Sequence, residues 1–345
     1  MLTLKRPPRL RRGDTVALLS LSSGMAGDDA FRFRYEIGKQ RLAEVFGLQV
    51  REYPTTLAGS EKVYRHPELR AQDLMAAFED PEIRAIFTCI GGEESMRLFP
   101  FLDLERIARH PKLLLGYSDT TFSHLVCLKA GFGTVYGPSL LAEFAENQEI
   151  FPYTRHWMEQ VLFCPVPAGE IPPADAFTRA YLPWTPENQH IGKALQPDPG
   201  PILLQGGGTA EGPLIGGCLD VLDFLRGTPV FPPLSAFQGS LVFLETSEES
   251  PSGEMVARWL RSLAAMGILK AAAGILFGKP YRADLEEEHR QAVQKILEEE
   301  HLLDTPVLFG LNFGHTEPMC CLPYGVRARL DCRRRTITLL ESAVL

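Results

Sequence analysis

A serine stands where a buried strand is expected to turn into a helix. Residues 112–124 read Lys-Leu-Leu-Leu-Gly-Tyr-Ser-Asp-Thr-Thr-Phe-Ser-His, a pattern typical of an apolar strand, a sharp turn and a helix. A serine on such a turn is lifted clear of the backbone, and free N–H groups at the start of the helix can hold a developing oxyanion. The Gly-x-Ser-x-Gly signature is not met, because position 120 is Thr120. Ser118 is therefore a candidate nucleophile, with an open alternative in which Ser118 or Asp119 only caps the helix.

Two glycines follow the end of another apolar stretch in the same half of the chain. Gly91 and Gly92 come directly after residues 85–90, Ala-Ile-Phe-Thr-Cys-Ile. One interpretation is a tight turn, because glycine adopts positive φ freely. The other is the second half of an oxyanion hole, with a backbone N–H close to the reacting carbonyl.

A serine nucleophile needs a base, and His315 is the best candidate among eight histidines. It lies in a short loop, residues 311–318, between two apolar segments, and loops held between rigid strands often carry function. Five other histidines have polar or helical surroundings and are predicted at the surface: His66, His110, His156, His289 and His301.

The imidazole also needs an acid to orient it. Glu245 ends the apolar stretch 240–244, and a carboxylate in such a place is rarely buried unless it is paired. We expect Glu245 to accept a hydrogen bond from His315, although it could instead meet a backbone amide. Glu248 and Glu249 are the rival acids.

The elements that must position these residues form two domains. Residues 1–165 alternate apolar strands (14–20, 85–90, 112–115) with helical patterns such as 67–79, which predicts an α/β domain with a doubly wound parallel sheet and a nucleophile elbow. Residues 166–201 are rich in proline and are predicted to be a linker or loop. Residues 202–345 predict a mixed β/α domain with strands at 202–204, 239–245, 273–277, 326–330 and 336–340 and a helix at 251–266, while the glycines of 206–212 indicate a turn.

Composition limits the partners and the cellular compartment that can be expected. The net charge of −8 argues against nucleic acid as a partner, and no apolar run reaches the ~20 residues that cross a bilayer. Seven cysteines without a Cys-x-x-Cys pair favour free thiols in the cytoplasm and give no zinc signature. No metal or organic cofactor is expected.

Together these segments resemble the serine LD-carboxypeptidases and the related microcin C immunity proteins. The resemblance covers nearly the whole chain and rests on Leu10-Arg-Arg-Gly-Asp14, 64–78, 90–98, Gly116-Tyr-Ser-Asp-Thr-Thr, Tyr136-Gly-Pro138, Leu214-Ile-Gly-Gly-Cys-Leu-Asp220, Leu244-Glu-Thr-Ser-Glu248, Phe277-Gly-Lys-Pro-Tyr281 and Phe313-Gly-His-Thr-Glu-Pro318.

The resemblance implies a catalytic triad of Ser118, Glu245 and His315. It also implies oxyanion donors on the backbone of Gly92 and Asp119, and a homodimer. Gly91 and Trp184 are candidate substrate contacts. For Trp184 the reason is that the immunity relatives stack a loop aromatic on a nucleobase.

The expected function is cleavage of an amide bond through an acyl-enzyme on Ser118. Two substrates remain open: an LD-peptide of the cell wall, or a peptidyl or aminoacyl adenylate analogue. Cys218, where many peptidoglycan-recycling members have asparagine, favours the immunity side of the family. A non-catalytic small-ligand binding protein on the same fold is the alternative, and an α/β-hydrolase esterase fits the β-rich second half poorly.

Overall fold

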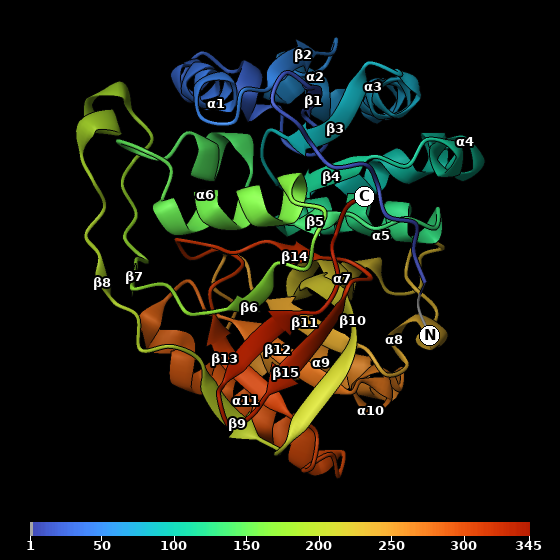
Figure 1. Ribbon diagram of the computed structural model, residues 1–345, viewed down its shortest axis with the longest axis vertical. Helices are drawn as coiled ribbons and strands as arrows, with labels where there is room; N and C mark the ends of the chain where they lie inside the picture. The colour runs from blue at the N-terminus through green and yellow to red at the C-terminus, as the bar shows by residue number, and fades with distance from the viewer. Residues whose placement is uncertain (1–2) are drawn as a thin grey trace.

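The computed structural model describes residues 3–345 and contains two domains, each built on its own sheet. Figure 1 shows the N-terminal half above and most of the C-terminal half below. None of the helices within residues 3–345 has the length and apolar character needed to cross a membrane. The two-domain α/β fold predicted from the sequence is confirmed.

The N-terminal sheet has six strands in the order β14-β5-β4-β3-β1-β2, and all neighbours are parallel except β14 and β5. Its strands are β1 (Thr15–Leu19), β2 (Gln49–Glu52), β3 (Ile83–Thr88), β4 (Leu113–Gly116), β5 (Val135–Tyr136) and β14 (Leu322–Pro323). Its helices are α1 (Arg32–Glu44), α2 (Ser60–Arg65), α3 (Pro67–Glu79), α4 (Leu104–Arg109), α5 (Thr121–Lys129) and α6 (Pro152–Met158).

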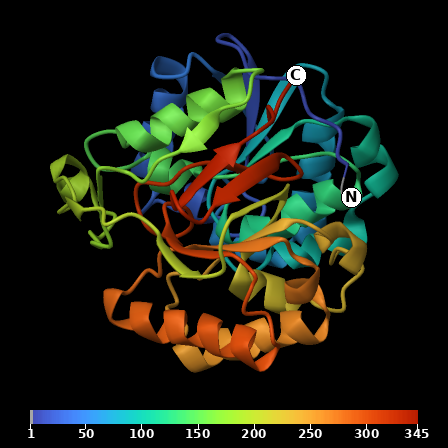
Figure 2. The same cartoon turned by 60° about the horizontal axis from the view of Figure 1, so that its bottom comes forward.

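The C-terminal sheet has eight strands in the order β6-β16-β15-β10-β11-β12-β13-β9. Its four central strands, from β10 to β13, run parallel, and the flanking pairs are antiparallel. The strands are β6 (Gly169–Ile171), β9 (Ile202–Gln205), β10 (Thr209–Cys218), β11 (Leu241–Glu245), β12 (Gly274–Gly278), β13 (Val307–Leu311), β15 (Arg327–Asp331) and β16 (Thr336–Leu339). The helices are α7 (Leu219–Leu225), α8 (Leu234–Phe237), α9 (Gly253–Ala265), α10 (Ile268–Ala271) and α11 (Glu286–Glu299), and α9 and α11 pack side by side below the sheet in Figure 2.

Apolar runs explain the buried strands. β4 and β11 are buried along their whole length, as expected of parallel strands covered on both faces. Helix α3 spans the predicted residues 67–79 and begins at Pro67, whose missing N–H costs nothing in the first turn. The turn predicted at 206–212 is too long, because β10 already begins at Thr209 and pairs with β15.

Two short strands pair with sheets far from them along the chain. β14, from the C-terminal part of the chain, pairs with β5 in the first sheet, and β6 pairs with β16 in the second. Residues 166–201 are therefore more than a linker, since they contribute β6 and the small ribbon of β7 (Ala176–Phe177) and β8 (Gln196–Pro197). The ranges 1–165 and 202–345 remain a proposed division.

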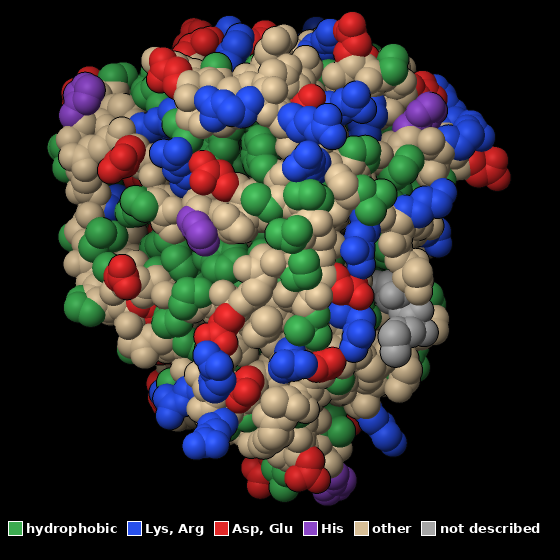
Figure 3. Space-filling view, in the orientation of Figure 1, with side chains coloured by type: hydrophobic (Ala, Val, Ile, Leu, Met, Phe, Trp, Pro, Cys, Tyr) green, Lys and Arg blue, Asp and Glu red, His purple; other side chains and the backbone are tan. Residues whose placement is uncertain are grey.

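Charged side chains of both signs are spread over the surface, as the modest net charge predicts. Figure 3 shows acidic and basic side chains interspersed over one face, with apolar side chains gathered near its middle, between the two domains.

Candidate active site

The turn between β4 and α5 holds Ser118 in a conformation that is unusual for a residue other than glycine. Its φ is +60°, the left-handed region that costs a side-chain-bearing residue energy. Neither Ser118 nor Asp119 accepts a capping hydrogen bond at the start of the helix. The capping alternative therefore has no support, and the strained serine matches the geometry of a nucleophile elbow.

Close contacts on two sides require the glycines after β3: Gly91 lies against the elbow, and Gly92 against the loop after β1. A Cβ on Gly91 would lie 3.0 Å from the Ser118 Oγ and 3.5 Å from the Asp119 nitrogen. A Cβ on Gly92 would lie 2.6 Å from the Ser22 Oγ. The loop after β3 therefore faces the serine with bare backbone, as an oxyanion hole requires.

Asp119 is held in place by its side chain. Its carboxylate accepts hydrogen bonds from the Ser22 hydroxyl and, at 2.8 Å, from the Ser95 N–H. Burial raises the pKa of this carboxyl, and those hydrogen bonds act in the opposite direction. The Oδ2 atom of this side chain thus holds the loops after β1 and β3 against the elbow.

Glu245 and His315 meet in the second domain. The His315 Nδ1 lies 2.7 Å from the Glu245 Oε2, and Glu245 is fully buried at the end of β11. Gly314 has φ +91°, and a Cβ there would lie 2.6 Å from the Glu245 Oε2. The glycine before the histidine therefore makes room for the acid.

Tyr136 connects this pair to the elbow. Its hydroxyl donates to the Glu245 Oε1 and accepts a 3.1 Å hydrogen bond from the Ser118 N–H. The register explains the contact, because Tyr136 lies beside Gly116 on the neighbouring strand. We did not predict Tyr136 as a site residue; its place in Tyr136-Gly-Pro138, one of the resembling segments, was the available signal.

The other ring nitrogen of His315 contacts an acid instead of the serine. Its Nε2 lies 2.9 Å from the Glu248 Oε2, and residues 3–345 contain no hydrogen bond between His315 and the Ser118 Oγ. Burial alone would lower the pKa of His315, but the charges and hydrogen bonds of Glu245 and Glu248 outweigh it and raise that pKa well above its usual value. Of the two rival acids, Glu248 therefore lies at the histidine, on the side opposite Glu245.

Two cavities flank this histidine and serine. One, of about 440 Å³, is lined by Ser118, Gly92 and Cys218, and the other, of about 300 Å³, by His315, Tyr117 and Trp184. Glu248 lines both cavities. A ligand that fills both would therefore pass Glu248.

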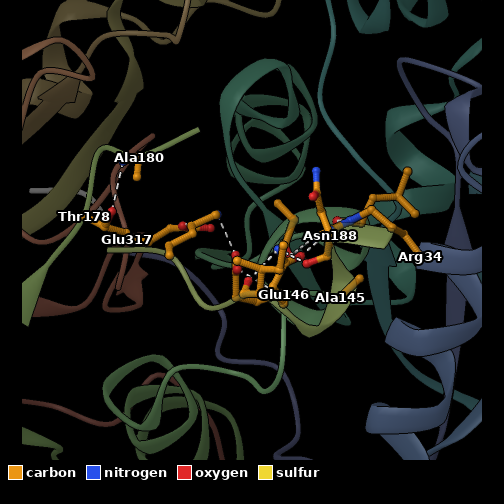
Figure 4. A network of polar contacts seen from close by, with 12 residues as sticks. Arg34, Ala145, Glu146, Thr178, Ala180, Asn188 and Glu317 are labelled. Carbon is orange, nitrogen blue, oxygen red and sulfur yellow. Dashed lines mark hydrogen bonds and ion pairs between the residues drawn. The ribbon is translucent and has the colours of Figure 1, made fainter. Parts of the chain in front are cut away.

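Trp184 belongs to a segment that is tied firmly over the second cavity. The guanidinium of Arg34 lies 4.3 Å from the Trp184 ring centroid, and Phe31 meets the ring edge-on. Lys193 pairs with Glu146 at 2.7 Å and also with Glu317. Figure 4 shows Arg34, Asn188, Glu146, Glu317 and Thr178 in one polar network that holds this segment against both domains.

The remaining histidines lie elsewhere. His289 was predicted at the surface, which is wrong: the ring is fully buried and its Nε2 lies 2.7 Å from the Pro251 carbonyl oxygen, because α11 turns that face toward α9. His124 is buried between Thr134 and the Gly116 carbonyl, behind the elbow. Among residues 3–345, no group of three or more His, Cys, Asp and Glu side chains is placed to hold a metal ion.

Each of the two sheet domains matches a domain of a known peptidase family. Residues 16–137 match the LD-carboxypeptidase N-terminal domain, and residues 211–330 match the LD-carboxypeptidase C-terminal domain. The chain belongs to the LD-carboxypeptidase family, as the sequence segments predicted.

Its relatives include carboxypeptidases and immunity proteins. The putative carboxypeptidase YocD of Bacillus subtilis is 30% identical over 94% of this chain and 95% of its own. The microcin C7 self-immunity protein MccF of Escherichia coli is 30% identical over 83% and 82%. MccF in complex with aspartyl sulfamoyl adenosine superposes with a TM-score of 0.87, at 25% identity over 99% of this chain and 100% of that one. An MccF-like protein from Streptococcus pneumoniae in complex with AMP has a TM-score of 0.87 and 32% identity over 94% and 98%.

Proposed function

We propose that this protein is a serine peptidase or amidase that cleaves an amide bond in a small peptide-like substrate through an acyl-enzyme on Ser118. The observation that carries the proposal is the strained Ser118 on the elbow, connected through Tyr136 to the Glu245–His315 pair. Strain of this kind persists where the surrounding structure enforces it, often at active sites.

The reaction follows from these positions. His315, in its neutral form, accepts the Ser118 proton through Nε2 as the serine oxygen attacks the carbonyl carbon. The N–H groups of Gly92 and Asp119 stabilise the oxyanion. The imidazolium then protonates the leaving amine, and a water molecule, activated by the same base, releases the acyl group. Glu245 holds the imidazole through Nδ1 and stabilises its charge.

The proposed substrate class is a peptidyl or aminoacyl nucleotide, with an LD-peptide of the cell wall as the second candidate. Solved relatives bind aspartyl sulfamoyl adenosine and AMP. In this chain Trp184 and Tyr117 present aromatic surface to the cavity beside His315, and stacking on an aromatic ring suits any nucleobase. Gly91 leaves room beside the nucleophile for the reacting group.

The cellular compartment and the oligomeric state are also part of the proposal. All seven cysteines are free thiols, and six of them are buried, which fits a reducing cytoplasm. We propose a homodimer, as the family resemblance implies, and light scattering on the purified protein tests it.

Ser118→Ala tests the nucleophile. The variant and the wild type are incubated with a cell-wall tetrapeptide and with aspartyl sulfamoyl adenosine, and the products are separated by mass. We expect wild-type cleavage and a loss of about 10⁶-fold in the variant, whose fold should be unchanged in circular dichroism. Residual activity above a tenth of wild type would show that Ser118 is not the nucleophile. Binding without cleavage, together with no labelling by a fluorophosphonate probe, favours the non-catalytic binding protein.

A further inference from the structure

His315 is held between two carboxylates that differ in exposure. The Nδ1 partner, Glu245, is fully buried, whereas 58% of the Glu248 side chain is exposed to solvent. Both contacts are short, at 2.7 and 2.9 Å. The nitrogen that must accept the Ser118 proton is therefore occupied by the more exposed of the two acids.

We propose that Glu248 is a positioning residue that occupies the Nε2 of His315 in the free protein and gives it up when substrate fills the two cavities that Glu248 lines. The inference rests on the proposed function, since it assigns the step that precedes activation of Ser118. It adds to the Ser-His-Glu triad a second acid that acts through the histidine.

The backbone around Glu248 restricts such a movement to its side chain. Ser247 donates a hydrogen bond from its hydroxyl to Asp220, and the Ser250 N–H donates to the Ser247 carbonyl oxygen at 3.1 Å. The first contact ties the start of the turn that carries Glu248 to α7, and the second closes the turn itself. Most of the Glu248 side chain already faces solvent, so water can solvate its carboxylate when a ligand displaces it from His315. Glu245, buried and also bonded by Tyr136, has no such freedom.

The contact also decides the protonation state of the base. An imidazole whose two nitrogens both face carboxylates is favoured as the cation, and a cation cannot take the serine proton. Burial would raise the pKa of Glu248, but the hydrogen bond and charge of His315 lower it to about 2. When Glu248 moves away, the Nε2 proton passes to water and the neutral nitrogen becomes free to accept the serine hydroxyl.

Other ionisable groups act on the same histidine and remain in place. Glu245 comes from β11, and Asp220, on α7, contributes a carboxylate whose pKa burial raises to about 6. The Tyr117 ring lies 5.0 Å from the His315 ring, and Glu143 and Glu317 line the cavity that contains them. Removing the Glu248 charge alone should therefore lower the pKa of His315 without abolishing its preference for the cation.

The test compares Glu248→Gln with the wild type by two readouts. The first is the ¹⁵N chemical shift of the His315 ring across pH, assigned with His315→Gln. The second is the pH dependence of Ser118 labelling by a fluorophosphonate. We expect both midpoints in Glu248→Gln to lie lower by about one pH unit or more, the usual effect of one neighbouring charge. Below the wild-type midpoint the variant should then label faster than the wild type.

Glu254→Gln is the matched control. Glu254 is an exposed glutamate on α9 that pairs with Arg258 and lies outside both cavities. The substitution changes the net charge equally, so its midpoints should stay at the wild-type values.

The two readouts separate failure of this inference from failure of the proposed function. An unchanged His315 titration in Glu248→Gln overturns the role of Glu248, whether or not Ser118 reacts. If the titration shifts but Ser118 is unlabelled at every pH in all variants, the hydrolase mechanism fails, and the role of Glu248 in activating the serine fails with it.

Discussion

The hydroxyl of Tyr136 contacts two of the candidate site residues at once. It bridges the Ser118 N–H and the Glu245 carboxylate, and it is buried without exposure to water. Burial and the charge of Glu245 raise the pKa of the phenol well above its usual value, so it remains a neutral donor. Ser118 and Glu245 are thereby fixed relative to each other by one residue from β5.

Tyr136→Phe should therefore weaken both stability and reactivity. It leaves a buried carboxylate oxygen and a backbone N–H without their partner, which costs about 1–3 kcal/mol per group. Chemical denaturation measures the first effect, and fluorophosphonate labelling of Ser118 the second. Tyr35→Phe is the control, because the Tyr35 hydroxyl is bonded to Glu52 outside the site. If both variants lose stability but label Ser118 equally well, Tyr136 has only a structural role.

The raised pKa of His315 predicts a pH dependence of stability. A group whose pKa is higher in the folded protein stabilises it fully below the unfolded value, near 6.5, and this contribution is lost as pH rises through the folded value. His315→Gln should therefore lose more stability relative to wild type at pH 6 than at pH 9. Urea denaturation at the two pH values measures the difference. Equal losses would show that His315 is not held as the cation.

At the scale of elements, the site depends on loops that leave strand ends with almost no side-chain bulk. Gly91 and Gly92 follow β3, Gly116 ends β4, and Gly314 lies after β13. A Cβ on Gly91 would meet Ser118, and one on Gly314 would meet Glu245. A Cβ on Gly92 or Gly116 would instead meet the hydroxyl of Ser22 or Thr88. The parallel strands supply a rigid frame, and Gly91 and Gly314 let the loops that follow it approach Ser118 and Glu245.

Gly314→Ala tests this idea at the acid. Its new Cβ would stand 2.6 Å from the Glu245 Oε2, at a φ of +91°. Gly13→Ala is a matched control, because Gly13 has φ +94° but no atom within 4 Å of the added Cβ. Both substitutions incur the cost of positive φ, roughly 1 kcal/mol. Only Gly314→Ala should also reduce the labelling of Ser118. If the two variants reduce labelling equally, the close approach of Gly314 to Glu245 is not the cause.

At the scale of the whole molecule, the proline-rich segment is fastened to the second domain by a buried ion pair. Asp198, next to β8, lies 3.0 Å from the Lys279 Nζ, and both side chains are almost completely buried. Asn312 also donates to Asp198, at 2.7 Å. Burial lowers the pKa of Lys279, while the charge of Asp198 opposes that shift. These contacts hold the segment that carries Trp184 over the cavity.

Lys279→Met should cost about 3–5 kcal/mol of unfolding free energy, because it leaves the Asp198 charge buried without its partner. The double variant Lys279→Met with Asp198→Asn removes both charges and should recover much of the loss. Thermal and urea denaturation measure the two variants side by side. A double variant as unstable as the single one would mean that packing, not charge, sets the cost.

The sequence by itself determined the elements and the chain positions of the candidate residues. Helical spacing places α3, and apolar runs place β1, β4 and β11, because both kinds of pattern are local. Ser118 and Glu245 could be proposed because each comes at or just after the end of an apolar strand, and His315 because its loop follows another apolar segment.

Only the tertiary structure decided which groups meet. The register of β4 with β5 brings Tyr136 to Ser118, and the path of the loop after β11 brings Glu248, not Glu249, to the Nε2 of His315. The pairing of β14 with the first sheet and of β6 with the second also depends on contacts between segments far apart in the chain, as does the burial of His289. Such contacts are set by packing of whole sheets and helices, for which a local pattern contains no information.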